Sequence, residues 1–218
     1  MNEHRRRKAL SDLVQQVHTE ADRTRASLNS SHANDAKAVD VIWQNTRAPL
    51  ITRAASQDGF TTFIQRSAIY DEAGMVLGGG PVKIDRCFAL TYLHTATEWS
   101  ESTRTVDGAR CEPGRTLAQA AASARTRLAT AARTGLTDTD VQRAFEVPSR
   151  AWSTGFDVRA TRRQGKAVSI ETILHLKKAG AAQQQCYQFD VTLPDGDQTP
   201  PDRLATARPV ADSACATG

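Results

Sequence analysis

The sequence predicts an α+β fold of two tandem duplicated units, each with helices packed on an antiparallel β-sheet. The first observation is the segment 155–193, where three runs alternate apolar and polar residues, as expected for strands with one face on a core. Short glycine-bearing segments at 162–166 and 178–181 separate the runs and predict hairpins. The second observation is a shared order of elements in the two halves, which indicates an internal duplication.

The shared order is a long helix, a short helix, a proline, a Gly-Phe pair, strands, a cysteine followed by apolar residues at alternate positions, a polar stretch and a final cysteine. The Gly-Phe pairs begin at Gly59 and Gly155. Residue identity between the halves is low, which leaves open that two ordinary α+β stretches merely look alike. We place the units at residues 1–114 and 115–218, and they can pack as one globule.

In the first half, apolar residues from Lys8 to Leu28 recur every three or four positions and predict an amphipathic helix. Asn34 or Asp35 can cap a second helix, which Pro49 ends. Strands are predicted at Phe60–Tyr70, Met75–Leu77 and Val82–Leu93, followed by a polar stretch at Glu98–Gly114.

In the second half, a helix begins at Thr116 and Gly135 is placed to end it. A short helix at Thr139–Phe145 can be capped by Thr137 or Asp138, and Pro148 follows it. After the three strands, a proline-rich tail at Pro194–Pro209 leads to the last cysteine.

Four cysteines occur in two similarly spaced pairs, Cys87 with Cys111 and Cys186 with Cys215. This spacing favours two disulfides over the other pairings, each stabilising the fold by about 3 kcal/mol. Free buried thiols and a metal site are the alternatives, but no Cys-x-x-Cys spacing or histidine pair supports a metal. Because disulfides persist in oxidising compartments, we expect an extracellular or cell-surface protein.

Export requires a signal that this sequence does not show. No apolar run approaches the roughly 18 residues that span a bilayer, and no signal-peptide pattern is present. We therefore expect a signal or a membrane anchor upstream of the sequence, with Met1 supplied in its place. The basic run 5–8 argues against an anchor immediately before it, an objection that a lipoprotein tether or a cleaved signal avoids.

The composition is that of an ordinary globular protein, with 39% hydrophobic and 24% charged residues. Arginine far outnumbers lysine, which is typical of GC-rich genomes such as those of actinobacteria. The net charge of +4 owes much to residues 5–8, and the other basic residues are scattered among acids without interleaved aromatics. We therefore expect no nucleic-acid partner.

The sequence contains none of the catalytic or metal-binding motifs that we sought, so we expect no cofactor and no metal. Trp43 and Trp152 lie in apolar surroundings and are expected in the core. Trp99 has polar neighbours, which makes it the best candidate for an exposed contact residue. His94 and Tyr92, on the preceding strand, are further contact candidates.

Residues 87–92 and 186–191 each begin with a cysteine that is followed by an aromatic residue and then alternating apolar positions. This pattern resembles exported or membrane-tethered actinobacterial, Streptomyces-like, proteins of unknown function, and the resemblance implies no activity. A helix packed on a curved antiparallel sheet is also similar to the cystatin-like and NTF2-like fold classes, a likeness that does not specify function.

We therefore expect a non-catalytic extracytoplasmic binding or protein-interaction domain of a cell-envelope protein. Its partner would be a protein or a cell-envelope component, membrane contact would come only through the missing anchor, and the oligomeric state is unknown. One alternative is an enzyme with an NTF2-like pocket, for which His94, Tyr92 and Asp85 are the candidates. Another is a cytoplasmic nucleic-acid-binding protein with free thiols.

Overall fold

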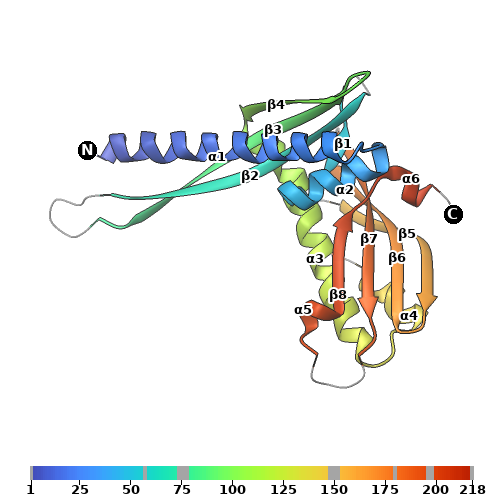
Figure 1. The fold of residues 1–218 in the computed structure, drawn as a ribbon. Coiled ribbons are helices and arrows are strands. Elements are labelled where there is room, and N and C mark those ends of the chain that lie inside the picture. The colour runs from blue at the N-terminus through green and yellow to red at the C-terminus, as the bar shows by residue number, and fades with distance from the viewer. Residues whose placement is uncertain are drawn as a thin grey trace.

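The computed structural model describes residues 2–55, 58–72, 79–146, 153–178, 181–194 and 199–216 (Figure 1). Its strands form two four-stranded antiparallel sheets, with the orders β1-β2-β3-β4 and β5-β6-β7-β8. A long helix packs on each sheet: α1 (Asn2–Ser30) on the first and α3 (Glu112–Ala132) on the second. The predicted α+β fold of two similar units is confirmed.

The first unit continues after α1 with α2 (Asp35–Thr46), β1 (Ile51–Arg53), β2 (Gly59–Asp71), β3 (Pro81–His94) and β4 (Trp99–Val106). Asn34 caps α2 as predicted, because its side chain accepts a hydrogen bond from the Lys37 N–H at 3.0 Å. Strand β4 was not predicted within the polar stretch that contains it. Its polar sequence suits an edge strand with one face in water. The predicted strand Met75–Leu77 lies outside the described residues.

After β4 the first half ends with the 3₁₀ turn η1 (Gly108–Cys111). The second unit is then built from α3, α4 (Asp138–Ala144), β5 (Ser153–Gln164), β6 (Ala167–Lys178), β7 (Ala181–Thr192), α5 (Pro201–Leu204), β8 (Ala205–Pro209) and α6 (Asp212–Cys215). The three predicted strands are therefore present, and Thr137 caps α4 with Asp140 in a reciprocal capping box. The tail contributes a fourth strand, β8, which was not predicted within its proline-rich sequence. A proline at the end of an edge strand removes no ladder hydrogen bond that the sheet needs.

Each core lies between a helix stripe and one sheet face. Helix α1 buries Leu13, Val17, Ala21 and Leu28, at spacings of four and seven residues, against the first sheet. Helix α3 buries mainly alanines and leucines, which let it approach the second sheet closely. None of the helices in the described ranges has both the length and the apolar composition needed to cross a membrane.

Both predicted disulfides are present, Cys87–Cys111 and Cys186–Cys215, with Cα–Cα distances of 5.9 and 6.0 Å. Each joins the third strand of its sheet to the segment that follows the fourth strand. The cysteines of the two halves are thus topologically equivalent. The Gly-Phe pairs are not, because Gly59 begins the second strand of its sheet whereas Gly155 lies in the first strand.

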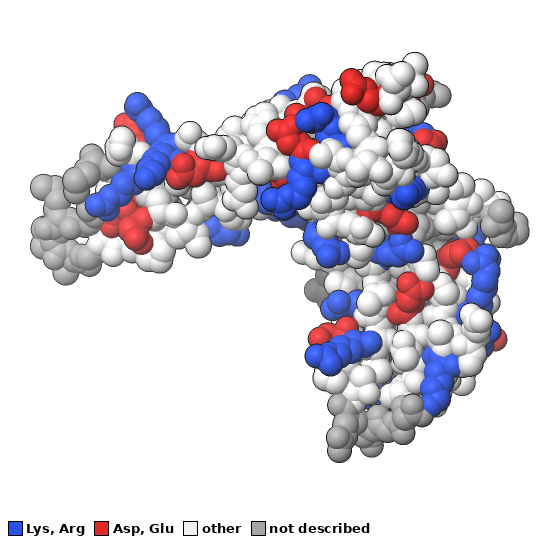
Figure 2. Space-filling view, viewed as in Figure 1, with Lys and Arg blue, Asp and Glu red and all other residues white. Residues whose placement is uncertain are grey.

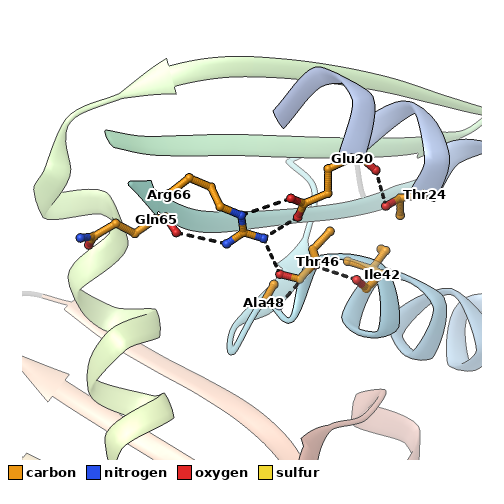
Figure 3. A network of polar contacts seen from close by, with 7 residues as sticks. All are labelled: Glu20, Thr24, Ile42, Thr46, Ala48, Gln65 and Arg66. Carbon is orange, nitrogen blue, oxygen red and sulfur yellow. Dashed lines mark hydrogen bonds and ion pairs between the residues drawn. The ribbon is translucent and has the colours of Figure 1, made fainter. Parts of the chain in front are cut away.

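A polar network pins α1 to β2 and to the end of α2 (Figure 3). Arg66 on β2 donates to both carboxylate oxygens of Glu20 on α1, at 3.1 and 2.5 Å, and to the Thr46 carbonyl at 2.8 Å. Because the guanidinium and the carboxylate are both planar, these two parallel bonds fix the relative orientation of the two side chains as well as the distance between them. The network therefore sets where α1 crosses the sheet.

The two units meet at the segment 49–51, which links α2 to β1. Leu50 belongs to the first unit in sequence but is buried in the core of the second. The buried Gln185 of β7 accepts a hydrogen bond from the Ile51 N–H at 2.8 Å. Its amide donates to the Val210 carbonyl at 3.0 Å and to the Cys186 carbonyl at 3.2 Å. The boundary at 114/115 stays a prediction, but the contacts show that the two units share packing.

Beyond this junction the first unit continues as an arm. In Figure 1, α1 and the long β2–β3 hairpin extend together away from the second sheet. Strand β4 pairs only with residues 87–94 of β3, and β1 pairs only with residues 60–62 of β2. The distal part of the hairpin is consequently a two-stranded ribbon accompanied by the first half of α1.

Candidate binding site at the junction of the two units

A groove with a volume of about 210 Å³ lies where the two units meet. Its walls come from both: α2 and the segment after it on one side, and α3, β7 and β8 on the other. The lining residues are Trp43, Arg47, Pro49, Ala118, Ala121, Ala122, Arg125, Tyr187, Ala207 and Pro209. The groove therefore combines small apolar side chains with two aromatic rings and two guanidinium groups.

Arg47 holds an unusual backbone conformation at one wall of the groove. It lies in the left-handed region, with φ 53° and ψ 29°, at the C-cap of α2, a region that glycine favours. Its N–H donates to the Trp43 carbonyl at 2.8 Å, and its guanidinium carbon lies 4.4 Å from the Trp43 ring centroid. A non-glycine residue pays about 1 kcal/mol for this conformation. In return the turn stacks a cation on an exposed aromatic face.

Arg125 brings a second positive charge to the groove from α3. Neither Arg47 nor Arg125 forms an ion pair with an acidic side chain in the part of the chain that the structure describes. Between them the floor is made of alanines and of Tyr187, whose hydroxyl donates to the Pro49 carbonyl at 2.5 Å. Burial raises the pKa of Tyr187, so the ring is a neutral and fixed part of the floor.

The structure corrects the expectation that Trp99 is exposed, because only 3% of this residue is accessible. The Asn29 side chain makes two hydrogen bonds with the Trp99 backbone: it accepts from the N–H at 2.7 Å and donates to the carbonyl at 3.2 Å. The ring packs on Phe60 and under the ring of His94, at centroid distances of 6.3 and 4.8 Å. Its polar neighbours misled the prediction because adjacent residues of a strand face opposite sides.

The three residues of the enzyme alternative are not brought together. Tyr92 is fully buried in the first core, and burial raises the pKa of its hydroxyl. His94 is exposed at the end of β3 over Trp99. Asp85 is seven residues before Tyr92 on the same strand, roughly 23 Å away at 3.3 Å per residue. These residues therefore do not form one catalytic site.

Trp43 is half-buried and packs against the first core, so it serves the core as expected and also lines the groove. Trp152 lies outside the described residues. Arg47 and Arg125 were not among the predicted site residues, and no local pattern identifies them, since arginines are abundant along the chain. In the described ranges, no three His, Cys, Asp or Glu side chains are grouped as metal ligands would be.

No protein-family model matches the chain. No curated protein matches it either. Among solved structures, an NTF2-like protein involved in plasmid conjugation is similar at 10% sequence identity over 74% of each chain, with a TM-score of 0.20. A TM-score this low carries no weight for function, and the expected resemblance to exported actinobacterial proteins stays a prediction.

Proposed function

We propose that this chain is a non-catalytic extracytoplasmic binding domain of a cell-envelope protein, and that the groove at the junction of its units receives a partner protein. The observation that carries the proposal is the pair of arginines, Arg47 and Arg125, which flank an aromatic and apolar floor without an acidic partner in the described residues. Such a site suits a carboxylate next to an apolar side chain.

The location outside the cytoplasm is supported by the two disulfides. Their formation pairs all four cysteines, and the structure leaves no free thiol. Such bonds are rare in reducing compartments and common in exported proteins. They tie the segment after the fourth strand of each sheet to its third strand, which stabilises the folded domain.

The composition of the surface favours a protein over a nucleic acid. Figure 2 shows acidic and basic side chains interspersed over the arm and over the second sheet. In the basic run at the start of α1, Arg7 pairs with Glu3, and Arg5 donates to the Asp71 carbonyl. A nucleic-acid backbone is bound by a continuous basic stripe, which the interspersed charges in this view do not form.

Site-specific photo-crosslinking in the producing cells tests the proposal. A benzophenone amino acid in place of Ala122, which is exposed in the groove, should give a discrete adduct with an envelope protein. The same group at Thr130, exposed on α3 but outside the groove, is the matched control. Replacing both Arg47 and Arg125 with serine should abolish the Ala122 adduct.

Equal adducts at Ala122 and Thr130 would refute the groove as the binding site, as would an Ala122 adduct that persists when Arg47 and Arg125 are replaced. Reduced cysteines in protein alkylated directly in the cells would refute the extracytoplasmic location independently. The two parts of the proposal can thus fail separately.

A further inference from the structure

The arm carries an open strand edge whose hydrogen-bonding groups are free in a regular pattern. Across β2 and β3, the Glu72 N–H donates to the Gly80 carbonyl at 3.0 Å and the His94 N–H donates to the Asp58 carbonyl at 2.7 Å. Both bonds join even-numbered residues in the same register as the rest of the ladder. Because hydrogen-bonded and non-hydrogen-bonded pairs alternate in antiparallel strands, even residues of β2 bond to β3 and odd residues point their N–H and C=O groups away from it.

Contacts on the other side of β2 agree with this assignment. The Gly59 carbonyl accepts from the Ala54 N–H at 2.9 Å, on the side of β1. Farther out, Arg66 donates to the Gln65 carbonyl at 3.1 Å, and Arg5 donates to the Asp71 carbonyl at 3.0 Å. All three carbonyls belong to odd residues. Between the two arginines the outward N–H and C=O groups of Ser67 and Ile69 have no backbone partner in the described residues.

This edge forms one wall of a groove of about 480 Å³, and α1 forms the other. The α1 side chains that line it share one stripe of the helix: Arg5, Lys8, Ala9, Asp12, Leu13 and Gln16. The strand side runs from Ser67 to Asp71. A helix stripe facing an unpaired strand edge is the arrangement that accepts an added strand.

The two edges of the ribbon differ in how they resist pairing. On β3 the outward-pointing positions are Pro81, Lys83 and Asp85, of which the proline lacks an N–H and the two charges pair with each other at 3.1 Å. Proline and charge are common protections of an edge strand. On β2 the corresponding positions hold Ser67 and Ile69, and Ile69 is the most exposed large hydrophobic residue described, at 67%. The β2 edge is therefore the one suited to pairing.

We propose that the β2 edge binds an extended segment of a partner protein as an additional antiparallel strand beneath α1. The segment spans the five positions opposite residues 66–70, with side chains facing α1 at alternate positions. Opposite Ala68 it meets Ala9 and Leu13 and carries a small apolar residue. Toward the tip it meets Arg5 and Lys8 and carries an acidic residue. On the outer face a β-branched residue covers Ile69.

The acetylated and amidated heptapeptide TEVVTQT, read antiparallel to β2, has this pattern and serves as the probe. In the free ¹⁵N-labelled protein, the amides of Ser67 and Ile69 exchange quickly with solvent, while those of Ala68 and Tyr70 are protected. Peptide at up to roughly 1 mM should protect the two exposed amides with saturable chemical-shift changes. A matched peptide that is N-methylated at its third and fifth residues loses the donors facing β2 and should bind at least tenfold more weakly.

On the protein side, Ile69→Pro removes an N–H that the chain itself does not use, and Ile69→Thr keeps it. Binding of the peptide should fall about tenfold in the proline variant and little in the threonine variant. The proposal is overturned if millimolar peptide leaves both amides unprotected, or if N-methylation does not weaken binding. It is also overturned if these amides are already protected in a concentration-dependent dimer seen by sedimentation, since the occupant would then be a second copy of this chain.

Discussion

Replacing Gln185 with leucine should destabilise the protein by about 4 kcal/mol. The side chain is 1% exposed, links the two units through the bond it accepts from the Ile51 N–H, and donates to the Val210 carbonyl within its own unit. Leucine has a similar volume but leaves both backbone groups buried without a partner. Each unsatisfied group costs roughly 1–3 kcal/mol, so two cost about 4 kcal/mol together. The Cys186 carbonyl keeps the bond it accepts from the Val210 N–H and adds little.

Equilibrium unfolding in urea, followed by tryptophan fluorescence and by far-ultraviolet circular dichroism, measures this loss. The neighbouring Gln184 is exposed, so Gln184→Ala is a matched control that should stay within about 0.5 kcal/mol of the parent protein. A Gln185→Leu variant as stable as the control would refute the reasoning. It would show that the junction can relax and hydrate these groups, and that the units are not coupled through this side chain.

Three further predictions follow from particular contacts. Replacing Cys87 and Cys111 with serine should lower the free energy of unfolding, measured in urea titrations, by about 3.5 kcal/mol, because the bond no longer closes a loop in the unfolded chain. Gly59→Ala should destabilise strongly in the same assay, because a Cβ there would lie 2.8 Å from the Leu93 Cα, whereas Gly155→Ala should be neutral because nothing lies within 4 Å. Hydrogen bonds from Thr137 hold the pKa of Asp140 below its ordinary value, so this stabilisation is present above about pH 4 and is lost as pH falls through the lowered pKa. An Asp140→Asn variant should therefore unfold at a lower temperature than the parent near neutral pH, and the difference should disappear as pH falls through the lowered pKa.

Periodicity and cysteine spacing predicted the fold class and the disulfides, but not the edge strands β4 and β8. Alternation along 155–193 predicted three strands because it depends only on neighbours along the chain. The similar spacing of the two cysteine pairs predicted both disulfides, although each joins residues 24 or 29 positions apart. The Gly-Phe pairs predicted an equivalence that the topology does not show. A two-residue match recurs easily by chance, whereas a disulfide imposes a geometry that both halves must satisfy.

The candidate site could not be predicted in the same way because its parts meet only in the folded chain. Gln183, Gln184 and Gln185 are identical neighbours in sequence, yet Gln185 alone is both fully buried and bonded across the junction. Arg47 and Arg125 lie 78 positions apart (125 minus 47) and face one groove because α2 and α3 converge there. Trp99 is the opposite case, a buried residue that was predicted to be exposed, because its polar neighbours belong to the other face of its strand.

The placement of the groove makes its binding dependent on the junction rather than on either unit alone. Trp43 and Arg47 come from the first unit, and Arg125 and Tyr187 from the second. Their separation is set by contacts that no ligand would touch, chiefly Leu50 in the second core and Gln185 under β1. A change at Gln185 should therefore weaken partner binding at the groove although it removes no lining residue. The strand edge on the arm lies within the first unit, so the same change should leave peptide binding there intact, and the two surfaces can be separated by one substitution.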